Sequence, residues 1–139
     1  MYRKLAVLTT SLEIINLLSS SSSVKLFAVG GEYSPTTRSF SQSSAVWCME
    51  HYHVDKSFIS CRSVSLNAGL TDTNDTDAML HKLALEHAHE RYLAIDSSKL
   101  DRDSFAEIAP LTCLDGIIME HPFPENWVRY LTANHIRIF

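Results

Sequence analysis

The stretch Arg91–Lys99 reads RYLAIDSSK, and it decides which fold the sequence predicts. Its apolar run, through Ile95, is typical of a strand that is buried on both faces of a sheet. The run stops at Asp96, and two serines and Lys99 follow. Open α/β sheets bind ligands beyond the carboxyl ends of their strands, so these polar groups indicate a binding site. Taken alone, the stretch fits a helix cap with a solvated lysine equally well.

Length and composition indicate one soluble globular domain. The chain has 139 residues, of which 45% are hydrophobic and 20% are charged, as in ordinary domains with a core. No apolar run approaches the roughly 20 residues that span a bilayer, so we expect no membrane partner. The net charge is −4, and no basic cluster exceeds Arg3-Lys4. This chain alone is therefore a poor candidate for binding a nucleic-acid backbone.

The cysteine content indicates the compartment. Cys48, Cys61 and Cys113 are odd in number, widely spaced and in apolar settings. We expect buried free thiols in a reducing environment, and therefore a cytoplasmic protein.

Strand and helix signals alternate along most of the chain. The expected strands are residues 5–8, 24–29, 56–61, 92–95, 116–119 and 136–139. The expected helices are one capped by Ser11 that ends near residue 18, and three over residues 43–52, 76–89 and 125–134. Residues 32–39 and 62–75 are rich in turn-forming and polar residues and are predicted to be loops. The alternation predicts an α/β domain with a mostly parallel sheet flanked by helices.

The sequence carries no motif for a metal or a covalent nucleophile. His87 and His89 are predicted to lie on a helix, where residues two apart point away from each other. Cys-x-x-Cys, His-Glu-x-x-His and Gly-x-Ser-x-Gly patterns do not occur. We therefore expect no metal, no cofactor and no nucleophilic catalysis.

Polar groups gather at the predicted strand ends. The charged ones are Asp55, Asp96 and Lys99, and the hydroxyls belong to Thr9, Thr10, Ser11, Ser60, Ser97 and Ser98. The pair Gly30-Gly31 ends another strand and leaves its backbone N–H groups open to an anion. Carboxylates accept hydrogen bonds from sugar hydroxyls, whereas lysine and backbone N–H groups hold phosphate. As a set, these residues suit a small phosphorylated carbohydrate, although each alone fits a cap or a solvated surface.

The order and spacing of several motifs resemble one known family. The motifs are Thr9-Thr10-Ser11, Val29-Gly30-Gly31, Val54–Ser60, Gly69-Leu70-Thr71-Asp72, Asp77-Ala78 and Asp96-Ser97-Ser98-Lys99. From about residue 5 to residue 139, the chain resembles the C-terminal sensor domain of DeoR-type transcriptional repressors. The Asp-x-Ser-Lys and Gly-Leu-Thr segments are the most specific parts.

The resemblance implies a fold related to ribose-5-phosphate isomerase, glucosamine-6-phosphate isomerase and CoA-transferases. In the family, this domain binds a phosphorylated sugar, and a helix-turn-helix domain on the same chain binds the operator. Carried onto this sequence, the effector-binding residues are Thr10, Ser11, Gly30, Gly31, Asp55, Gly69, Asp96 and Lys99. Lys99 is expected to hold the phosphate, and Asp55 and Asp96 the sugar hydroxyls.

Family members carry further segments before the point where this chain begins, namely the helix-turn-helix domain and a strand with an Asp-x-Gly-Thr-Thr loop. We therefore expect a single effector-binding domain over residues 1–139, without that strand and its phosphate loop, and DNA binding only through a domain absent from this chain. An edge strand without its neighbour predicts a homo-oligomer. The family's glycine near the start of the second helix corresponds to Gln42.

The leading hypothesis is the effector-binding and oligomerising portion of a DeoR-type repressor, in which a sugar phosphate favours one conformation of the regulator. Two alternatives stay open. One is a sugar-phosphate isomerase with Asp55 or Asp96 as general base. The other is a module that only dimerises and senses no ligand.

Overall fold

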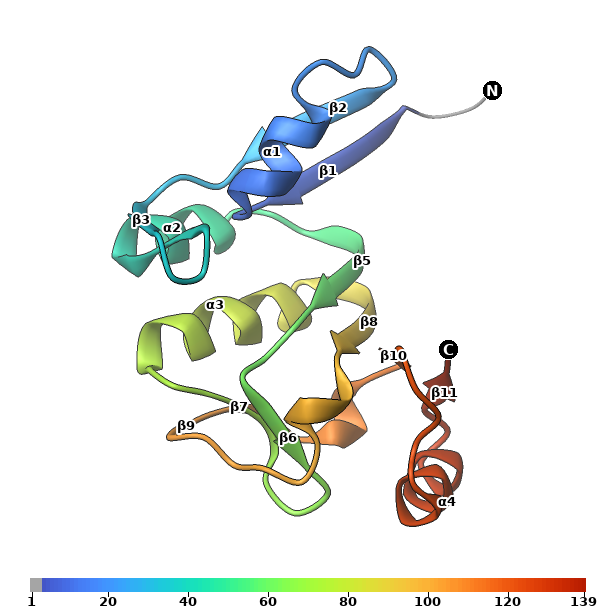
Figure 1. The fold of residues 1–139 in the computed structure, drawn as a ribbon. Coiled ribbons are helices and arrows are strands. Elements are labelled where there is room, and N and C mark those ends of the chain that lie inside the picture. The colour runs from blue at the N-terminus through green and yellow to red at the C-terminus, as the bar shows by residue number, and fades with distance from the viewer. Residues whose placement is uncertain (1–3) are drawn as a thin grey trace. The chain divides into compact units, whose positions relative to one another are not determined.

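The computed structural model describes residues 4–139. The chain divides into two compact units, of which the first ends at His51 and the second spans Tyr52–Phe139. They are unit 1, coloured blue to teal in Figure 1, and unit 2, coloured green to red. Each unit is described by itself.

Unit 1 begins with a parallel β-α-β arrangement and continues with a hairpin and a helix. Its elements are β1 (Leu5–Thr9), α1 (Leu12–Leu18), β2 (Val24–Ala28), β3 (Glu32–Ser34), β4 (Ser39–Ser41) and α2 (Gln42–Met49). Strands β1 and β2 pair in parallel, with Thr9 opposite Ala28. Ser11 caps α1, because its hydroxyl accepts a hydrogen bond from the N–H of Ile14 at 3.3 Å. The first two predicted strands and the capped helix are confirmed.

The loop predicted over residues 32–39 is wrong. Strands β3 and β4 form an antiparallel hairpin there, in which Tyr33 pairs with Phe40 and their ring centroids lie 5.5 Å apart. Such aromatic pairs stabilise short hairpins across the strands. The strands are only three residues long, so the turn residues around Pro35 dominate the composition and conceal them.

Gln42, the first residue of α2, has a φ of 73°. This lies in the left-handed region, which costs a side-chain-bearing residue about 1–2 kcal/mol. The strain falls at the position where the resemblance places a glycine. Helix α2 then ends at Met49, three residues before the predicted end.

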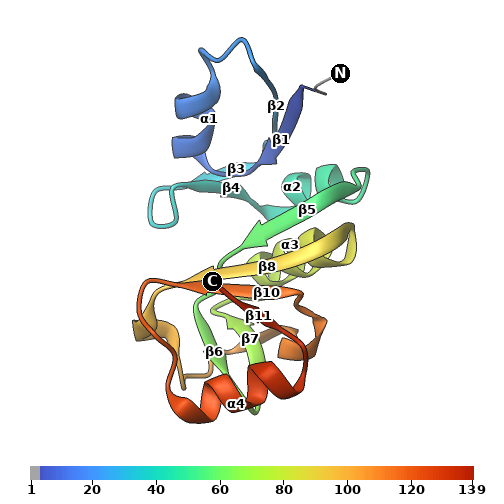
Figure 2. The same cartoon turned by 90° about the vertical axis from the view of Figure 1, so that its right-hand side faces the viewer.

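Unit 2 holds the main sheet. Its elements are β5 (Val54–Ile59), β6 (Ser63–Ser65), β7 (Gly69–Asp72), α3 (Asp75–Glu86), β8 (Ala88–Ile95), the 3₁₀ turn η1 (Ser97–Lys99), β9 (Ala106–Ala109), the 3₁₀ turn η2 (Leu111–Cys113), β10 (Gly116–Met119), α4 (Glu125–Ala133) and β11 (Arg137–Ile138). Four parallel strands are arranged in the order β11-β10-β8-β5. Figure 2 shows these strands side by side, with α3 alongside and α4 nearby. The predicted mostly parallel α/β fold is confirmed.

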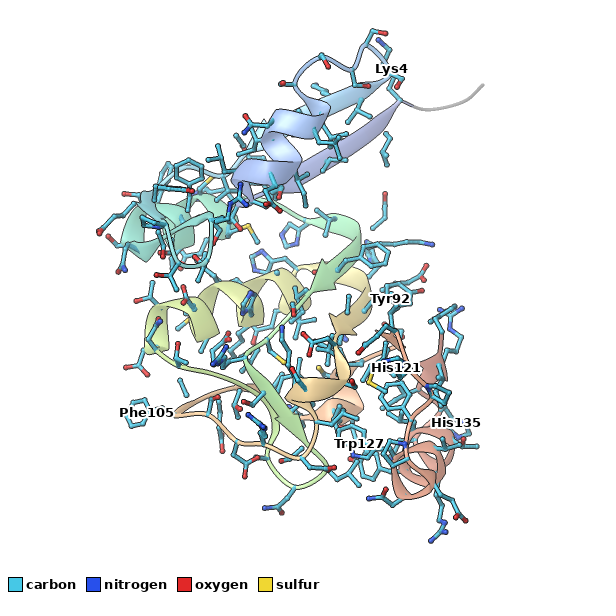
Figure 3. All side chains as sticks on the ribbon, in the orientation of Figure 1. Lys4, Tyr92, Phe105, His121, Trp127 and His135 are labelled. Carbon is cyan, nitrogen blue, oxygen red and sulfur yellow. The ribbon has the colours of Figure 1, made fainter. Side chains whose placement is uncertain are left out.

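The stretch that decided the prediction forms β8, which lies between β5 and β10. Leu93 is fully buried and pairs with Ile117, also fully buried. Both belong to the core, to which α3 contributes Leu85 and α4 contributes Trp127. Trp127 lies on the inner side of α4 (Figure 3), where its indole N–H donates to Asp101 at 2.9 Å. Ala94 is exposed, so the expected burial on both faces holds only in part.

The long loop predicted over residues 62–75 is also wrong. Strands β6 and β7 form an antiparallel hairpin, and β9 extends it to three strands. Its polar residues are buried and bonded to one another: Thr71 donates to the Ser63 carbonyl at 3.3 Å, and the Ser63 and Ser104 hydroxyls lie 2.8 Å apart. A buried hydroxyl with a partner is compatible with a strand, although composition alone predicts a loop.

The bounds of α3 differ from the predicted helix. Asn74 caps it by accepting from the N–H of Asp77 at 2.9 Å, and the helix begins at Asp75, one residue before the predicted start. The helix ends at Glu86, so His89 lies on β8 and the helical argument about the two histidines does not apply. Among residues 4–139, no three histidine, cysteine or acidic side chains lie close enough to hold a metal. In the same range, no helix has the length and hydrophobicity of a membrane span.

Replacing Gln42 with glycine should stabilise unit 1. Gln42→Gly removes left-handed strain, partly offset by glycine's greater freedom in the unfolded chain, for a net gain of about 0.5–1 kcal/mol. Hydrogen exchange of the α2 amides should slow accordingly. The control is Ser43→Gly, one residue along the helix, which should speed exchange. Faster exchange in Gln42→Gly would contradict the assignment of strain to this residue.

Candidate functional site

The carboxyl ends of three neighbouring strands in unit 2 are joined by polar side chains. After β5, the hydroxyl of Ser60 accepts a hydrogen bond from the Lys99 ammonium, which follows β8, at 2.9 Å. The N–H and hydroxyl of Ser97 donate to Glu120, which follows β10, at 2.9 and 2.8 Å. We call this group the strand-end site; it comprises Ser60, Asp96, Ser97, Ser98, Lys99 and Glu120.

Asp96 caps the turn η1. Its carboxylate accepts from the N–H of Ser98 at 3.0 Å and from the Ser98 hydroxyl. These bonds, the hydroxyl bond first, lower the pKa of Asp96 from its ordinary value. Asp96 is therefore a cap, as one of the two interpretations expected, and it also stands at the carboxyl end of β8. At neutral pH it presents an ionised carboxylate.

Glu120 is a member of the site that the sequence analysis missed. The backbone N–H of Ser97, more than the Ser97 hydroxyl, lowers the pKa of Glu120. The N–H and hydroxyl of Ser97 thus donate together to one anionic group, here the Glu120 carboxylate. The signal was present in the sequence, since Glu120 directly follows the predicted strand 116–119.

Cys61 follows Ser60 and is 4% exposed. Burial, with a smaller contribution from Asp72, raises the pKa of its thiol to about 11, against the opposing charge of Lys99. The thiol is therefore protonated at neutral pH and is a weak nucleophile. All three cysteines are free, but only Cys61 is buried; Cys48 and Cys113 are partly exposed, so the expectation of buried thiols is wrong for those two.

Asp55 does not join the strand-end site. It is the second residue of β5, at the amino end of that strand, and it is exposed. Since Val54 pairs with Ala88, Asp55 stands level with His89 on β8. Asp96 lies seven residues further along, which is roughly 20 Å at about 3.3 Å per residue. The grouping of Asp55 with Asp96 is therefore wrong, because β5 begins before Asp55.

Gly69 has a structural reason to be glycine. Its φ is +73°, and an added Cβ would lie 2.5 Å from the carbonyl oxygen of Ala109 and 2.9 Å from Cα of Pro110. The turn between β6 and β7 thus packs directly on the end of β9. Gly69 also lines a cavity whose walls include no residue of the strand-end site.

The candidates of unit 1 lie at one edge of its parallel pair. Thr10 and Ser11 follow β1, and Gly30 and Gly31 follow β2. The ends of the two strands are adjacent, because the N–H of Val29 donates to the carbonyl of Thr9 at 2.9 Å. The expectation that these four residues share an edge is met within unit 1.

The two glycines of this edge differ. A Cβ added to Gly30 would meet nothing within 4 Å, so its backbone is open. A Cβ added to Gly31 would overlap the carbonyl oxygen of Ser41 and lie 3.1 Å from Cβ of Ala45. Gly31 therefore serves packing against α2, and Gly30 is the glycine whose backbone a ligand can approach.

Comparison with known proteins identifies the family. The model of the DeoR C-terminal sensor domain matches residues 2–121. The chain belongs to the DeoR family of sensor domains. The strand-end site and the unit 1 edge are thus features of a DeoR-type sensor domain.

The similar curated proteins are regulators of this kind. The chain is 29% identical over 130 residues to the L-fucose operon activator of Haemophilus influenzae, covering 94% of this chain and 52% of that protein. It is 29% identical over 136 residues to the HTH-type transcriptional regulator IolR of Bacillus subtilis, covering 98% and 54%. It is 32% identical over 118 residues to the lactose phosphotransferase system repressor of Lactococcus lactis, covering 85% and 46%. The chain spans about half the length of these relatives.

Replacing each of the two unit 1 glycines with alanine should show that Gly31 is required for packing and Gly30 is not. Gly31→Ala forces the Ser41 carbonyl to move and should destabilise unit 1 by about 1–3 kcal/mol. Gly30→Ala should change stability by less than about 0.5 kcal/mol. Urea unfolding followed by Trp47 fluorescence, in a Trp127→Phe background, measures both. Equal losses in the two variants would contradict the distinction.

Proposed function

We propose that this chain is the effector-binding and oligomerising portion of a DeoR-type transcriptional repressor in the cytoplasm. Residues 1–139 are proposed to work as a single effector-binding domain. The proposed effector is a phosphorylated sugar. The observation that carries the proposal is the strand-end site, where a lysine, an anion-binding N–H and an ionised aspartate meet. The names of the relatives support a carbohydrate ligand, since they include a fucose operon activator and a lactose phosphotransferase system repressor.

The geometry suggests a role for each group. Lys99 is assigned to the phosphate: its ammonium has three donors, and Ser60 uses one of them. The N–H and hydroxyl of Ser97 are further phosphate donors, for which the Glu120 carboxylate competes. Asp96 is assigned to the sugar hydroxyls. Within unit 1, the hydroxyls of Thr10 and Ser11 and the open backbone at Gly30 are proposed as effector contacts, and Gly31 is assigned to the packing that holds this edge in place. Asp55 and Gly69 are left out for the reasons given above.

The regulatory step is proposed to be a population shift. An effector that binds one conformation of the sensor more tightly than another changes the affinity of an attached DNA-binding domain, by at most the difference between its two binding free energies. That DNA-binding domain is proposed to correspond to the part of the relatives, such as the HTH-type regulator IolR, that this chain does not match.

We propose that the chain is not an enzyme. Asp96, one of the two general bases considered, has a lowered pKa because Ser98 donates to it, which makes it a weak base at neutral pH. Asp55, the other, stands at the amino end of β5. No contact in unit 2 favours the isomerase alternative.

Removing the Lys99 charge should weaken effector binding. A charged hydrogen bond to phosphate contributes about 1.5–3 kcal/mol, so Lys99→Met should weaken binding about tenfold or more. Calorimetric titration with a panel of triose, pentose and hexose phosphates measures this. Lys56→Met, at an exposed position earlier on β5, is the matched control and should bind normally. No heat from any sugar phosphate with the folded wild-type chain would contradict the proposed sensing.

The open edge of β1 should support self-association. Within residues 4–139, β1 pairs only with β2, and its first residue, Leu5, is 63% exposed. A charge on an unpaired edge opposes pairing with another chain. Light scattering should therefore show an oligomer that Leu5→Lys weakens. Leu17→Lys, at an exposed position on α1, should leave it intact. A monomer at every concentration would contradict this prediction, and an oligomer without any ligand response would favour the dimerisation-only alternative.

A further inference from the structure

A cavity of about 570 Å³ opens in unit 2 away from the strand-end site. Its walls come from the turn between β6 and β7, the second half of α3, β9 with η2, and Tyr130 of α4. β8 contributes Arg91 to the wall. Arg91 lies five residues before Asp96, which is on the order of 15 Å along the strand. The cavity is therefore separate from the proposed effector contacts.

The walls are mixed, with polar and apolar surface in nearly equal parts. The larger apolar side chains are Leu66, Leu85, Ile108, Leu111 and Tyr130. Small-molecule sites in proteins have volumes of about 300–1,000 Å³, apolar walls and a few polar groups that orient the ligand. The cavity has this size, and its apolar side chains lie beside a small number of charged ones.

Arg91 is the half-buried charged residue of the cavity wall. Its Nε donates to the Leu85 carbonyl at 2.7 Å. No other protein acceptor for this guanidinium is found among residues 4–139, which leaves its terminal N–H groups available for a ligand. Lys82 and Glu86 also line the cavity, but they are exposed and their charged groups lie 3.9 Å apart. Glu107, the remaining charged residue of the wall, is exposed.

We propose that this cavity is a second ligand site of the domain, which binds a small amphipathic carboxylate. The Arg91 guanidinium holds the carboxylate, since its planar donors match two carboxylate oxygens. The apolar side chains of the walls cover the hydrocarbon body, whose removal from water lowers the free energy. This inference goes beyond the sugar-phosphate proposal and involves none of its residues in the strand-end site.

Cys113 provides an internal reporter. It lines the cavity and is partly exposed. Burial raises the pKa of its thiol, and the nearby Arg91 charge partly opposes this rise. The thiol and the guanidinium thus share one environment. A ligand held by Arg91 should therefore cover Cys113.

The test uses octanoate and its neutral analogue octanamide as probes for the full chain. Calorimetry should show one octanoate per chain, with octanamide at least about tenfold weaker, the loss expected when a charged hydrogen bond is removed. Arg91→Met should weaken octanoate about tenfold and leave octanamide unchanged. Lys99→Met should change neither. Octanoate should also slow the alkylation of Cys113 by iodoacetamide, with Cys48 of unit 1 as the unprotected reference thiol.

A second variant covers the case in which Arg91→Met does not fold. Ala68→Phe, on the turn between β6 and β7, fills the cavity and keeps Arg91. It should abolish octanoate binding and leave the sugar-phosphate titration intact. No octanoate binding to the wild-type chain, equal binding of the two probes, or unchanged binding in Ala68→Phe would each overturn the proposal. Because the strand-end site is tested with a different ligand, failure here is distinguishable from failure of the proposed function.

Discussion

The parallel pairing of β8 with β5 on one side and β10 on the other is the constraint on which unit 2 depends. Parallel strands end at the same edge, so Ser60, Asp96 and Glu120, which are distant in sequence, follow neighbouring strand ends. The pairing also requires Gly116, because an added Cβ would lie 2.8 Å from the ring of Tyr92. Gly116 therefore lets β10 lie close to the rings of Tyr92 and Phe139.

The sequence predicted most of the fold because apolar runs and strand-ending polar residues are local signals. The run 92–95 identified β8, and the motif order indicated the family. The same logic failed where a boundary was misplaced. Asp55 directly precedes the predicted strand 56–61, whereas the observed strand β5 already includes it. Glu120, like Asp96, is a charged residue that directly follows a predicted strand, so the same rule would have identified it. It was missed because it belongs to none of the family motifs.

The missed hairpin of β6 and β7 has a different cause. Buried polar residues have the composition of a loop until their partners are known, and those partners are distant in sequence. Asp72 is 6% exposed, accepts from the N–H of Arg62 at 3.0 Å, and lies 2.5 Å from Nδ1 of His81. Such long-range bonds stabilise a strand that no local pattern of hydrophobicity reveals. The cavity beside Arg91 was beyond sequence analysis for the same reason, since five separate segments form its walls.

The state of the groups at the strand-end site suits binding more than turnover. A catalyst needs a base or nucleophile whose pKa lies near the working pH. Here the pKa of Asp96 is lowered by Ser98, and the neighbouring Cys61 thiol has its pKa raised to about 11. Lys99 already donates to Ser60, and Glu120 accepts from Ser97. Asp96 and Glu120 are therefore carboxylates and Cys61 is a thiol at neutral pH, each with a hydrogen-bonded partner, which supports the proposed role of the site in recognition.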